Sequence, residues 1–302
     1  MSFLDDLNVF DAHHRVNCPQ YESVATQLFS VGPFSSFELF PFLHVSAFKD
    51  FELRSTGELH RTLSSSGTSG KPSRVFIDKA DSLAQMRSLG RIFTRRFGGR
   101  RRQMFVVTED VGDLSARHAA VSGFTALGKP VSLSKIDQTI TEEEPIVFGM
   151  TTDVWAHRDL MRKFSSVKPI VIHGGGWKRL EALSVSRDGF GRSLRELCPR
   201  AEIVNFFGMV EQVGTVYFDC VLGNFHEHEE GKFLIRSEKT LEVTDLGLLQ
   251  LFSLVPRSYP GHSLLTDDVC KLVQECGCGD KSPAFQYVSR RNKAPTRGCA
   301  NV

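Results

Sequence analysis

Several kinds of segment are absent from this sequence, and each absence excludes a class of protein. No apolar run approaches the roughly 18 residues that a membrane-spanning helix requires, so no membrane span is expected. The first residues, MSFLDDLNVF, are acidic and lack the basic start of a secretory signal, which predicts a cytoplasmic protein. The net charge is only +2, with 37 Lys and Arg against 35 Asp and Glu, and this balance predicts no nucleic-acid partner.

Cysteines are few and their number is odd. Seven cysteines in 302 residues, without an export signal, favour free thiols over a disulfide framework. Paired CxxC units are missing, and Cys270, Cys276 and Cys278 follow the spacing C-x5-C-x-C instead. With Cys299 or a histidine they form a weak structural zinc motif, which leaves open a zinc-stabilised, catalytically inactive binding or scaffold protein. The histidine motifs His13-His14 and His226-Glu227-His228 are interpreted as surface positions without a role.

Tyrosine and tryptophan are scarce, but 24 phenylalanines and 41% hydrophobic residues predict a soluble globular protein with a well-filled interior. Short β-branched or aromatic runs alternate with helical stretches through much of the chain, which is typical of a layered α/β fold. The expected strands are Met104–Thr108, Pro145–Phe148, Pro169–His173 and Ala201–Phe207. The expected helices are Asp78–Phe97, Ala116–Leu127 and Asp153–Phe164.

The sequence after Gly214 is richer in expected strands, namely Thr215–Cys220, Lys232–Ile235 and Leu248–Phe252. We therefore predict an α/β region over residues 1–214 and a β-rich subdomain with a short C-terminal tail over 215–302. Near the start, Phe42–Phe48 is expected to be extended. The cationic run Arg95–Arg102 is interpreted as a solvated turn ahead of a buried strand.

The most distinctive polar segment is Ser64–Arg74, SSSGTSGKPSR. Gly67 and Gly70 allow positive φ angles that turn backbone N–H groups toward one point, forming an anion-binding nest. The segment also supplies hydroxyl donors and cations: Ser65, Thr68, Ser69, Lys71 and Arg74. This composition predicts a polyphosphate-binding loop, and a flexible linker is the alternative.

The spacing of this loop excludes a Walker motif. Only two residues separate its glycines, whereas a Walker loop needs four, and Pro72 follows the lysine where Ser or Thr is required. A P-loop kinase or GTPase is therefore disfavoured.

Three later segments suit a nucleotide. Gly174, Gly175 and Gly176 follow an expected strand and leave room for a flat ring such as a nucleobase, although a plain strand-to-helix turn is the alternative. Glu211 follows a glycine turn and is a candidate Mg²⁺ ligand, although most loop glutamates are simply solvated. The pair Asp267-Asp268 suits hydrogen bonds from ribose hydroxyls, and a helix cap is its alternative.

The motifs SSSGTSGKPS, GGGWK, FFGMVEQ, GHSLLTDD, CGCG and a terminal RGC stand in one order along the chain. This ordered set resembles the acyl-protein synthetases of bacterial luminescence, the LuxE type. Those proteins are relatives of phenylacetate–CoA ligases within the adenylate-forming (ANL) superfamily. NCPQY and PFLHVSAFK extend the resemblance over nearly the whole chain.

The resemblance implies the α/β N-terminal domain of an adenylate-forming enzyme, lacking most of the mobile C-terminal domain. It implies that ATP and Mg²⁺ activate a carboxylic acid, fatty or aromatic, to an acyl adenylate. The acyl group then passes to a thiol, which is the chain's own Cys299, coenzyme A or a carrier protein. An acyl reductase or acyltransferase would be the later partner. Residues 1–214 would bind ATP and the acid.

The resemblance also implies individual roles. Pyrophosphate binding falls to Ser65, Ser66, Gly67, Thr68, Ser69 and Gly70. The adenine site comprises Gly174, Gly175, Gly176, Phe207 and Gly208. Glu211 would bind Mg²⁺, Asp268 the ribose and Arg290 the nucleotide, and Cys299 would be acylated. The loop composition alone, apart from the resemblance, predicts that Lys71 or Arg74 neutralises phosphate charge. Two positions depart from the family pattern, because Val210 replaces a usual Thr and Asp267 a usual Gly.

Overall fold

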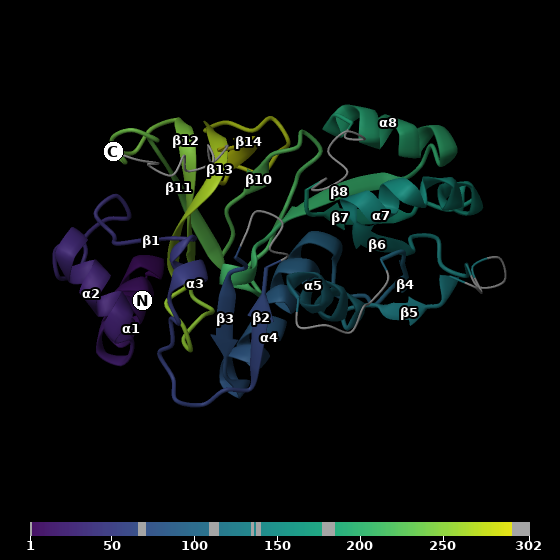
Figure 1. Ribbon diagram of the computed structural model, residues 1–302. Helices are drawn as coiled ribbons and strands as arrows, with labels where there is room; N and C mark the ends of the chain where they lie inside the picture. Colours follow the sequence, from purple (N-terminus) through teal and green to yellow (C-terminus); the bar gives the residue numbers. More distant parts are fainter. Residues whose placement is uncertain are drawn as a thin grey trace, which may run out of the picture.

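The computed structural model describes residues 2–65, 71–108, 115–133, 136, 140–176 and 185–291. Figure 1 shows two main sheets side by side, with helices around the first and a pair of helices beyond the second. A short hairpin lies below the junction of the two sheets.

The first sheet has the strand order β5-β4-β6-β7-β8-β9. Its strands are parallel except for β9, which runs antiparallel to β8. The bounds are β4 Gln103–Val106, β5 Lys129–Val131, β6 Ile146–Met150, β7 Ile170–Gly174, β8 Glu202–Phe207 and β9 Tyr217–Phe218. β6 and β7 are buried and apolar along nearly their whole length, as expected for parallel strands covered on both faces. The predicted strands in this region are confirmed.

Helices cover both faces of this sheet. One face packs on α4 (Lys79–Phe97) and α5 (Ala116–Thr125), where Phe93 and Phe124 meet Phe148 in one core. The other face packs on α7 (Thr151–Ala156), η2 (Arg158–Phe164) and α8 (Arg187–Leu197), around Val147 and Val171. Neighbouring residues of β6 therefore point into different cores, as the two-residue period of a strand requires.

The second sheet has the order β10-β14-β13-β12-β11, and β1 pairs with β13. The bounds are β1 Leu43–His44, β10 Phe225–His226, β11 Gly231–Arg236, β12 Leu246–Ser253, β13 Ser263–Val273 and β14 Ala284–Arg290. Its pairs are antiparallel except for the parallel β1–β13 pair. Phe285 lies at the centre of the core beneath it, against Phe225 and Phe233.

A fourth core joins distant parts of the chain. It contains residues of α2 (Pro19–Leu28), of the hairpin β2 (Arg61–Ser64) and β3 (Arg74–Ile77), and of the second sheet. It also contains Val210 from η4 (Val210–Gln212). α1 (Phe3–Asn17) begins with a capping box between Ser2 and Asp5 and packs nearby through Leu7. The hairpin is thereby fixed between the N-terminal helices and the two sheets.

Two expectations about secondary structure were wrong. Phe42–Phe48 is extended only at β1, because Ala47–Asp50 forms the short helix α3 and buries Phe48 against Tyr259, with ring centroids 6.0 Å apart. Asp267 and Asp268 lie within β13, so the alternative of a helix cap does not apply to this pair. Aspartate disfavours strands, but Asp268 pairs with Arg290 of β14, and the rest of β13 pairs with β12 on both sides of the irregularity at these aspartates, which outweighs that preference. The predicted helix Asp153–Phe164 divides at His157 into α7 and η2.

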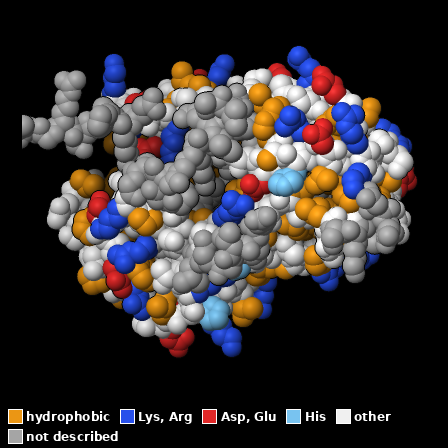
Figure 2. Space-filling model, turned by 45° about the vertical axis from the view of Figure 1, so that its right-hand side comes forward, with side chains coloured by type: hydrophobic (Ala, Val, Ile, Leu, Met, Phe, Trp, Pro, Cys, Tyr) orange, Lys and Arg blue, Asp and Glu red, His pale blue; other side chains and the backbone are white. Residues whose placement is uncertain are grey.

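The division into residues 1–214 and 215–302 stays a prediction. β9, which follows Gly214, still pairs with β8 of the first sheet. β1 lies far before Gly214 in the sequence, yet it pairs with β13 of the second sheet. Within the described part of the chain, no helix has both the length and the apolar character needed to cross a membrane. On the face shown in Figure 2, basic and acidic side chains lie close to one another over much of the surface.

Candidate active site

The predicted phosphate loop connects the two strands of the β2–β3 hairpin. Ser64 pairs with Arg74 at its base. The Ser65 amide donates to the Ser73 carbonyl at 3.0 Å, and the Ser73 amide donates to Ser65 Oγ at 2.9 Å. The hairpin therefore holds the two ends of the loop together. Ser66, Gly67, Thr68, Ser69 and Gly70, which the sequence predicts to bind pyrophosphate, lie outside the described residues.

The two cations after the loop differ in their surroundings. Lys71 is exposed. Arg74 is exposed as well, and its guanidinium lies 5.9 Å from the Phe76 ring centroid. Lys71 thus stays the better candidate for neutralising phosphate charge.

Glu211 is buried in η4, with only 7% of its surface exposed. Burial raises the pKa of its carboxyl above the usual value. A hydrogen bond from the Ser73 hydroxyl and the charges of Arg290 and Lys49 act in the opposite direction without cancelling that rise. Ser73 follows the phosphate loop, Lys49 lies in α3, and Arg290 ends β14. Groups from three distant segments thus act on one carboxylate.

The position of Glu211 is fixed by its neighbours in η4. Gln212 donates through Nε2 to the carbonyl oxygens of Leu251 at 3.2 Å and Gly261 at 2.8 Å. Val210 packs in the core shared by the hairpin and the second sheet. An apolar side chain suits that core, because a threonine hydroxyl there would require a hydrogen-bond partner. This accounts for the departure from the family pattern at Val210.

Asp268 and Arg290 stand directly opposite each other on β13 and β14. Arg290 Nε lies 4.0 Å from Asp268 Oδ1, and 65% of the arginine side chain is exposed. Burial raises the pKa of Asp268, and the Arg290 charge opposes that rise. The pair is within reach of solvent and of a ligand, as the predicted ribose and nucleotide contacts require.

Asp267 has different surroundings. It is buried, accepts from Arg291 at 3.0 Å, and lies 3.3 Å from His44 Nε2. The Arg291 amide also donates to the Asp267 carbonyl at 2.8 Å. The unusual aspartate of this segment therefore links β1, β13 and the end of β14.

The three glycines end β7, at the carboxyl edge of the parallel sheet. A Cβ on Gly174 would lie 2.5 Å from the Phe206 ring, so packing explains that glycine. Gly175 has a φ of +78°, which glycine adopts without strain. At Gly176 no described atom lies within 4 Å of an added Cβ. Packing therefore explains Gly174, a positive φ explains Gly175, and Gly176 faces open space among the described residues.

Phe207 and Gly208 follow β8, whose Phe206 pairs with Gly174. The Phe207 ring packs on Phe285 with centroids 5.6 Å apart, so it contributes to the core of the second sheet. Gly208 is exposed. Carboxyl edges of parallel strands are the usual place for nucleotides in α/β sheets, and this edge leads directly into η4.

The structure adds two residues that the motif analysis did not assign, Lys49 and Ser73. Both act on Glu211. Each lies within a motif already singled out, PFLHVSAFK and SSSGTSGKPS, but their approach to Glu211 depends on the packing of α3 and β3 against η4. Cys299 lies outside the described residues.

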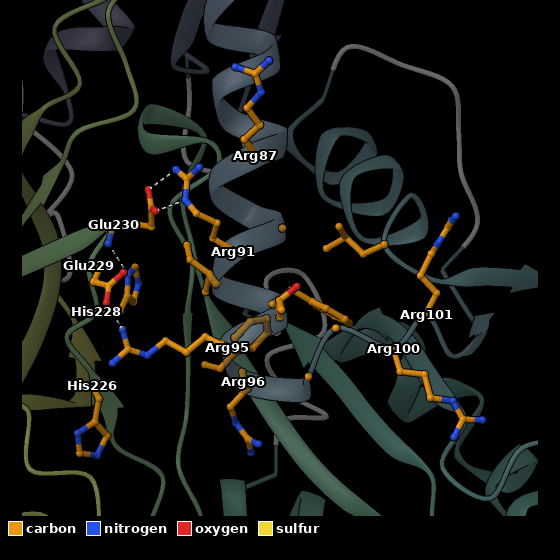
Figure 3. Close-up of a pocket in the computed structure, with 18 of the residues that line it drawn as sticks. Arg87, Arg91, Arg95, Arg96, Arg100, Arg101, His226, His228, Glu229 and Glu230 are labelled. Atoms are coloured by element: carbon orange, nitrogen blue, oxygen red, sulfur yellow. Dashed lines mark hydrogen bonds and ion pairs between the residues drawn. The ribbon is translucent and has the colours of Figure 1, made fainter.

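A groove of about 1120 Å³ lies elsewhere, along α4 and the segment after it. Figure 3 shows its arginines, with Arg91 turned toward Glu230 and Arg95 toward Glu229. None of the predicted site residues is among its lining residues. Several of these cations pair with carboxylates of the chain itself, whereas the residue types around Glu211 suit a nucleotide.

The cysteine and histidine expectations need correction. Cys270 is buried in the core of the second sheet, and burial raises its pKa far above the usual value, so it does not join Cys276 and Cys278. Those two instead meet Cys220 and His226. His226 is therefore no isolated surface residue, and neither is His14, which is fully buried against His262 with rings 4.7 Å apart.

Comparison with solved structures identifies the fold. The chain is similar to 2-hydroxyisobutyryl-CoA ligase in an open conformation with 2-HIB-AMP and CoA, at 14% identity over 95% of this chain and 69% of the ligase, with a TM-score of 0.75. It is also similar to ATP-bound MatB from Rhodopseudomonas palustris, at 10% identity over 76% of this chain and 47% of MatB, with a TM-score of 0.54.

A third similar structure is McyG A-PCP with phenylalanyl-adenylate, at 14% identity over 78% of this chain and 47% of that one, with a TM-score of 0.52. Identities this low establish a shared fold alone. The predicted α/β fold of an adenylate-forming enzyme is thus confirmed. No curated protein sequence matches the chain significantly.

The sequence itself carries the family assignment. The family model for the acyl-protein synthetase LuxE matches residues 146–302, more than half of the chain. This range includes the glycine edge of β7, Glu211, and the Asp268–Arg290 pair. The chain belongs to the LuxE acyl-protein synthetase family.

Proposed function

We propose that this protein uses ATP to activate a carboxylic acid and then transfers the acyl group to a thiol. In the first step a carboxylate oxygen attacks the α-phosphorus, and the bond to pyrophosphate breaks, which leaves an acyl adenylate. In the second step a thiolate sulfur attacks the acyl carbon and AMP leaves. Such chemistry depends on positioning and charge neutralisation more than on a protein base.

The observation that carries this proposal is the position of Glu211. It accepts a hydrogen bond from Ser73 at the base of the phosphate loop, the charge of Arg290 acts on it, and it follows the β8 edge that pairs with Gly174. A buried carboxylate, a cation-bearing loop and a glycine edge are the parts that a nucleotide triphosphate with Mg²⁺ requires.

These residues fit the group that the family implies. Glu211 would hold Mg²⁺, which when bound neutralises charge on the phosphate oxygens. Asp268 would accept from the ribose hydroxyls, and Arg290 would contact the nucleotide. Gly174–Gly176, Phe207 and Gly208 would line the adenine, with Gly176 leaving the space that a ring needs. Lys71 and the residues Ser65–Gly70 would hold the pyrophosphate.

We propose Cys299 as the acyl acceptor, with coenzyme A or a carrier-protein thiol as the alternative. Arg290, Arg291, Lys293 and Arg297 precede Cys299 in sequence, and cations near a thiol favour the reactive thiolate. The acyl group would then pass to an acyl reductase or an acyltransferase. A cytoplasmic location is part of the same proposal.

The acid is proposed to be fatty or aromatic, because acyl pockets are mostly apolar and this chain is rich in phenylalanine. A pyrophosphate-release screen across fatty and aromatic acids, with and without coenzyme A, followed by intact mass, identifies acid and acceptor together. We expect acid-dependent release and a covalent acyl adduct that Cys299→Ser abolishes while pyrophosphate release persists. Calorimetry with Mg²⁺ that detects no binding of ATP, AMP or an acyl-AMP mimic would overturn the proposal.

A second candidate function is a zinc-stabilised binding or scaffold protein without catalysis. The cluster of Cys220, His226, Cys276 and Cys278 is the observation in its favour. It becomes the preferred function if the protein contains stoichiometric zinc and the screen yields no pyrophosphate with any acid. Zinc together with acid-dependent release supports the enzyme.

A further inference from the structure

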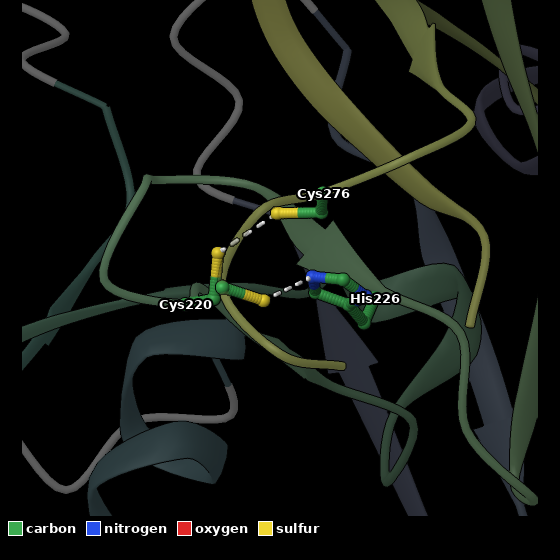
Figure 4. Close-up of side chains that lie close together, drawn as sticks. Cys220, His226 and Cys276 are labelled. Carbon is green, nitrogen blue, oxygen red and sulfur yellow. Dashed lines mark hydrogen bonds between the residues drawn. The ribbon is translucent and has the colours of Figure 1, made fainter. Parts of the chain in front are cut away.

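Four ligand-type side chains meet where the connection between the two sheets approaches a loop of the second sheet. Cys220 and His226 flank the turn between β9 and β10, while Cys276 and Cys278 lie in the loop between β13 and β14. In Figure 4 the side chains of Cys220, Cys276 and His226 point toward one common centre. His226 is buried and the three cysteines are half-buried.

The spacing of the ligand atoms fits a tetrahedron around a metal ion. Zn–S bonds of about 2.3 Å and Zn–N bonds of about 2.0 Å give tetrahedral edges of roughly 3.8 Å between sulfurs and 3.5 Å between sulfur and nitrogen. Cys220 Sγ and Cys276 Sγ lie 3.6 Å apart, and Cys278 Sγ lies 3.3 Å from His226 Nε2. All four ligand atoms lie within 4.8 Å of one another.

The surroundings orient these ligands. His226 Nδ1 lies 2.9 Å from the carbonyl oxygen of Ser282, which can only accept, so Nδ1 carries the proton. The lone pair of Nε2 therefore faces Cys278. Asn224 donates through Nδ2 to Cys276 Sγ at 3.2 Å, as expected beside a thiolate. Such outer contacts are typical of metal-binding histidines and cysteines.

A disulfide explains the cluster less well. Its two sulfurs would lie about 2.05 Å apart, well below the 3.6 Å between Cys220 and Cys276. A disulfide would also leave one cysteine and a histidine converging on the same point without a function.

We propose that Cys220, His226, Cys276 and Cys278 bind one Zn²⁺ ion in a structural site. Three thiolates and one imidazole match a borderline-soft ion with tetrahedral preference. Four protein ligands leave no open coordination position, so the ion holds loops together and does not activate water.

The proposed ion would join the connection between the two sheets to the β13–β14 loop. Asp219, next to Cys220, already accepts from Arg187 of α8 at 2.8 Å, so the first loop is anchored to the first sheet's helices. β13 and β14 also carry Asp268 and Arg290, farther along the same strand pair. The ion would therefore hold in place the hairpin that carries two proposed nucleotide contacts.

Metal analysis of the purified full chain tests the site. We expect one zinc per chain in the wild type, and loss of that zinc in both Cys276→Ser and Cys278→Ser. Cys270→Ala is the matched control, because Cys270 lies in the same sheet but outside the cluster, and it should retain the zinc. Zinc bound equally by the control and by both cluster variants would overturn the proposal.

Cobalt substitution of the wild type keeps the proposal falsifiable if the variants fail to fold. The reduced, metal-stripped protein should take up one Co²⁺ and develop thiolate charge-transfer and tetrahedral d–d absorption, which one equivalent of Zn²⁺ then removes. No such absorption, or a Cys220–Cys276 disulfide in protein prepared under reducing conditions, would overturn the site. Both readouts are independent of pyrophosphate release, so they separate the zinc site from the proposed enzyme activity.

Discussion

At the scale of single residues, neighbouring positions in the sequence perform different tasks. Asp267 and Asp268 are consecutive in β13, where its pairing with β12 is irregular, and their side chains meet different partners. Asp267 is enclosed by His44 and Arg291, whereas Asp268 faces the exposed Arg290. One carboxylate stabilises the fold and the other is available to a ligand.

These two aspartates make a matched pair of variants. Asp268→Asn should raise KM for ATP about 10- to 100-fold, because the variant loses one hydrogen bond to a charged group. The unfolding free energy should change little. Asp267→Asn should lower the unfolding free energy by about 1–3 kcal/mol. Pyrophosphate-release kinetics and urea denaturation measure both. An unchanged KM for ATP in Asp268→Asn would remove this residue from the proposed site.

Glu211 is the second residue with a decisive test. Glu211→Gln keeps the shape of the side chain but removes the charge that would hold Mg²⁺, so acid-dependent pyrophosphate release should fall on the order of 100-fold or more. Glu196→Gln, on the exposed surface of α8, is the control and should retain full activity. Equal activity of the two variants would exclude Glu211 as the magnesium ligand.

At the scale of elements, the end of β7 combines a packing constraint with open space. Gly174 pairs with Phe206 of β8 and touches its ring, while Gly176 lies two residues beyond in an exposed position. Glycine is therefore needed at Gly174 for close packing and at Gly176 for the space that it leaves.

Alanine substitution separates these causes. Gly174→Ala should lower the unfolding free energy by about 1–3 kcal/mol, because the new Cβ would lie 2.5 Å from the Phe206 ring. Gly176→Ala should leave stability within about 0.5 kcal/mol and weaken binding of an acyl-AMP mimic. Thermal unfolding and calorimetry test the pair. Full affinity in Gly176→Ala would argue against an adenine site at this turn.

At the scale of the whole molecule, several cores enclose histidines in their neutral form. Burial lowers the pKa of His173 to about 3 and that of His262 to about 3. His173 packs on Phe190 of α8, and His262 lies against Tyr21 of α2. Both link helices to a sheet.

Acid should therefore destabilise the fold. Below the unfolded pKa of about 6.5 the unfolded chain binds protons that the folded chain excludes, so unfolding free energy should fall from pH 6.5 toward pH 3. Each histidine adds at most about 1.4 kcal/mol per pH unit to the slope of unfolding free energy against pH, and it adds nothing to that slope above about pH 7.5. Urea denaturation between pH 7.5 and 5 measures this slope. His173→Gln should make it shallower, and an unchanged slope would contradict the burial argument.

The sequence by itself determined the local structure of this protein. Helical periodicity predicted α4 to within one residue, and apolar runs predicted β4, β6, β7 and β8, because both signals depend on neighbours close in the chain. The ordered motifs indicated the family that the match over residues 146–302 confirms. Roles assigned to the motif residues stay predictions that the described geometry supports.

Only the tertiary structure decided which distant residues share a site. Through it, Lys49, Ser73 and Arg290 act on Glu211. The consecutive Asp267 and Asp268 have different partners. In the cysteine cluster, Cys220 stands in place of Cys270, and His226 is the histidine. Strand β13 was not predicted, because its aspartates disfavour a strand, and only β14 opposite Asp268 and β12 on both sides of the aspartates hold this segment extended. Contacts between remote segments depend on how the sheets and helices pack, and no local pattern of residues records that packing.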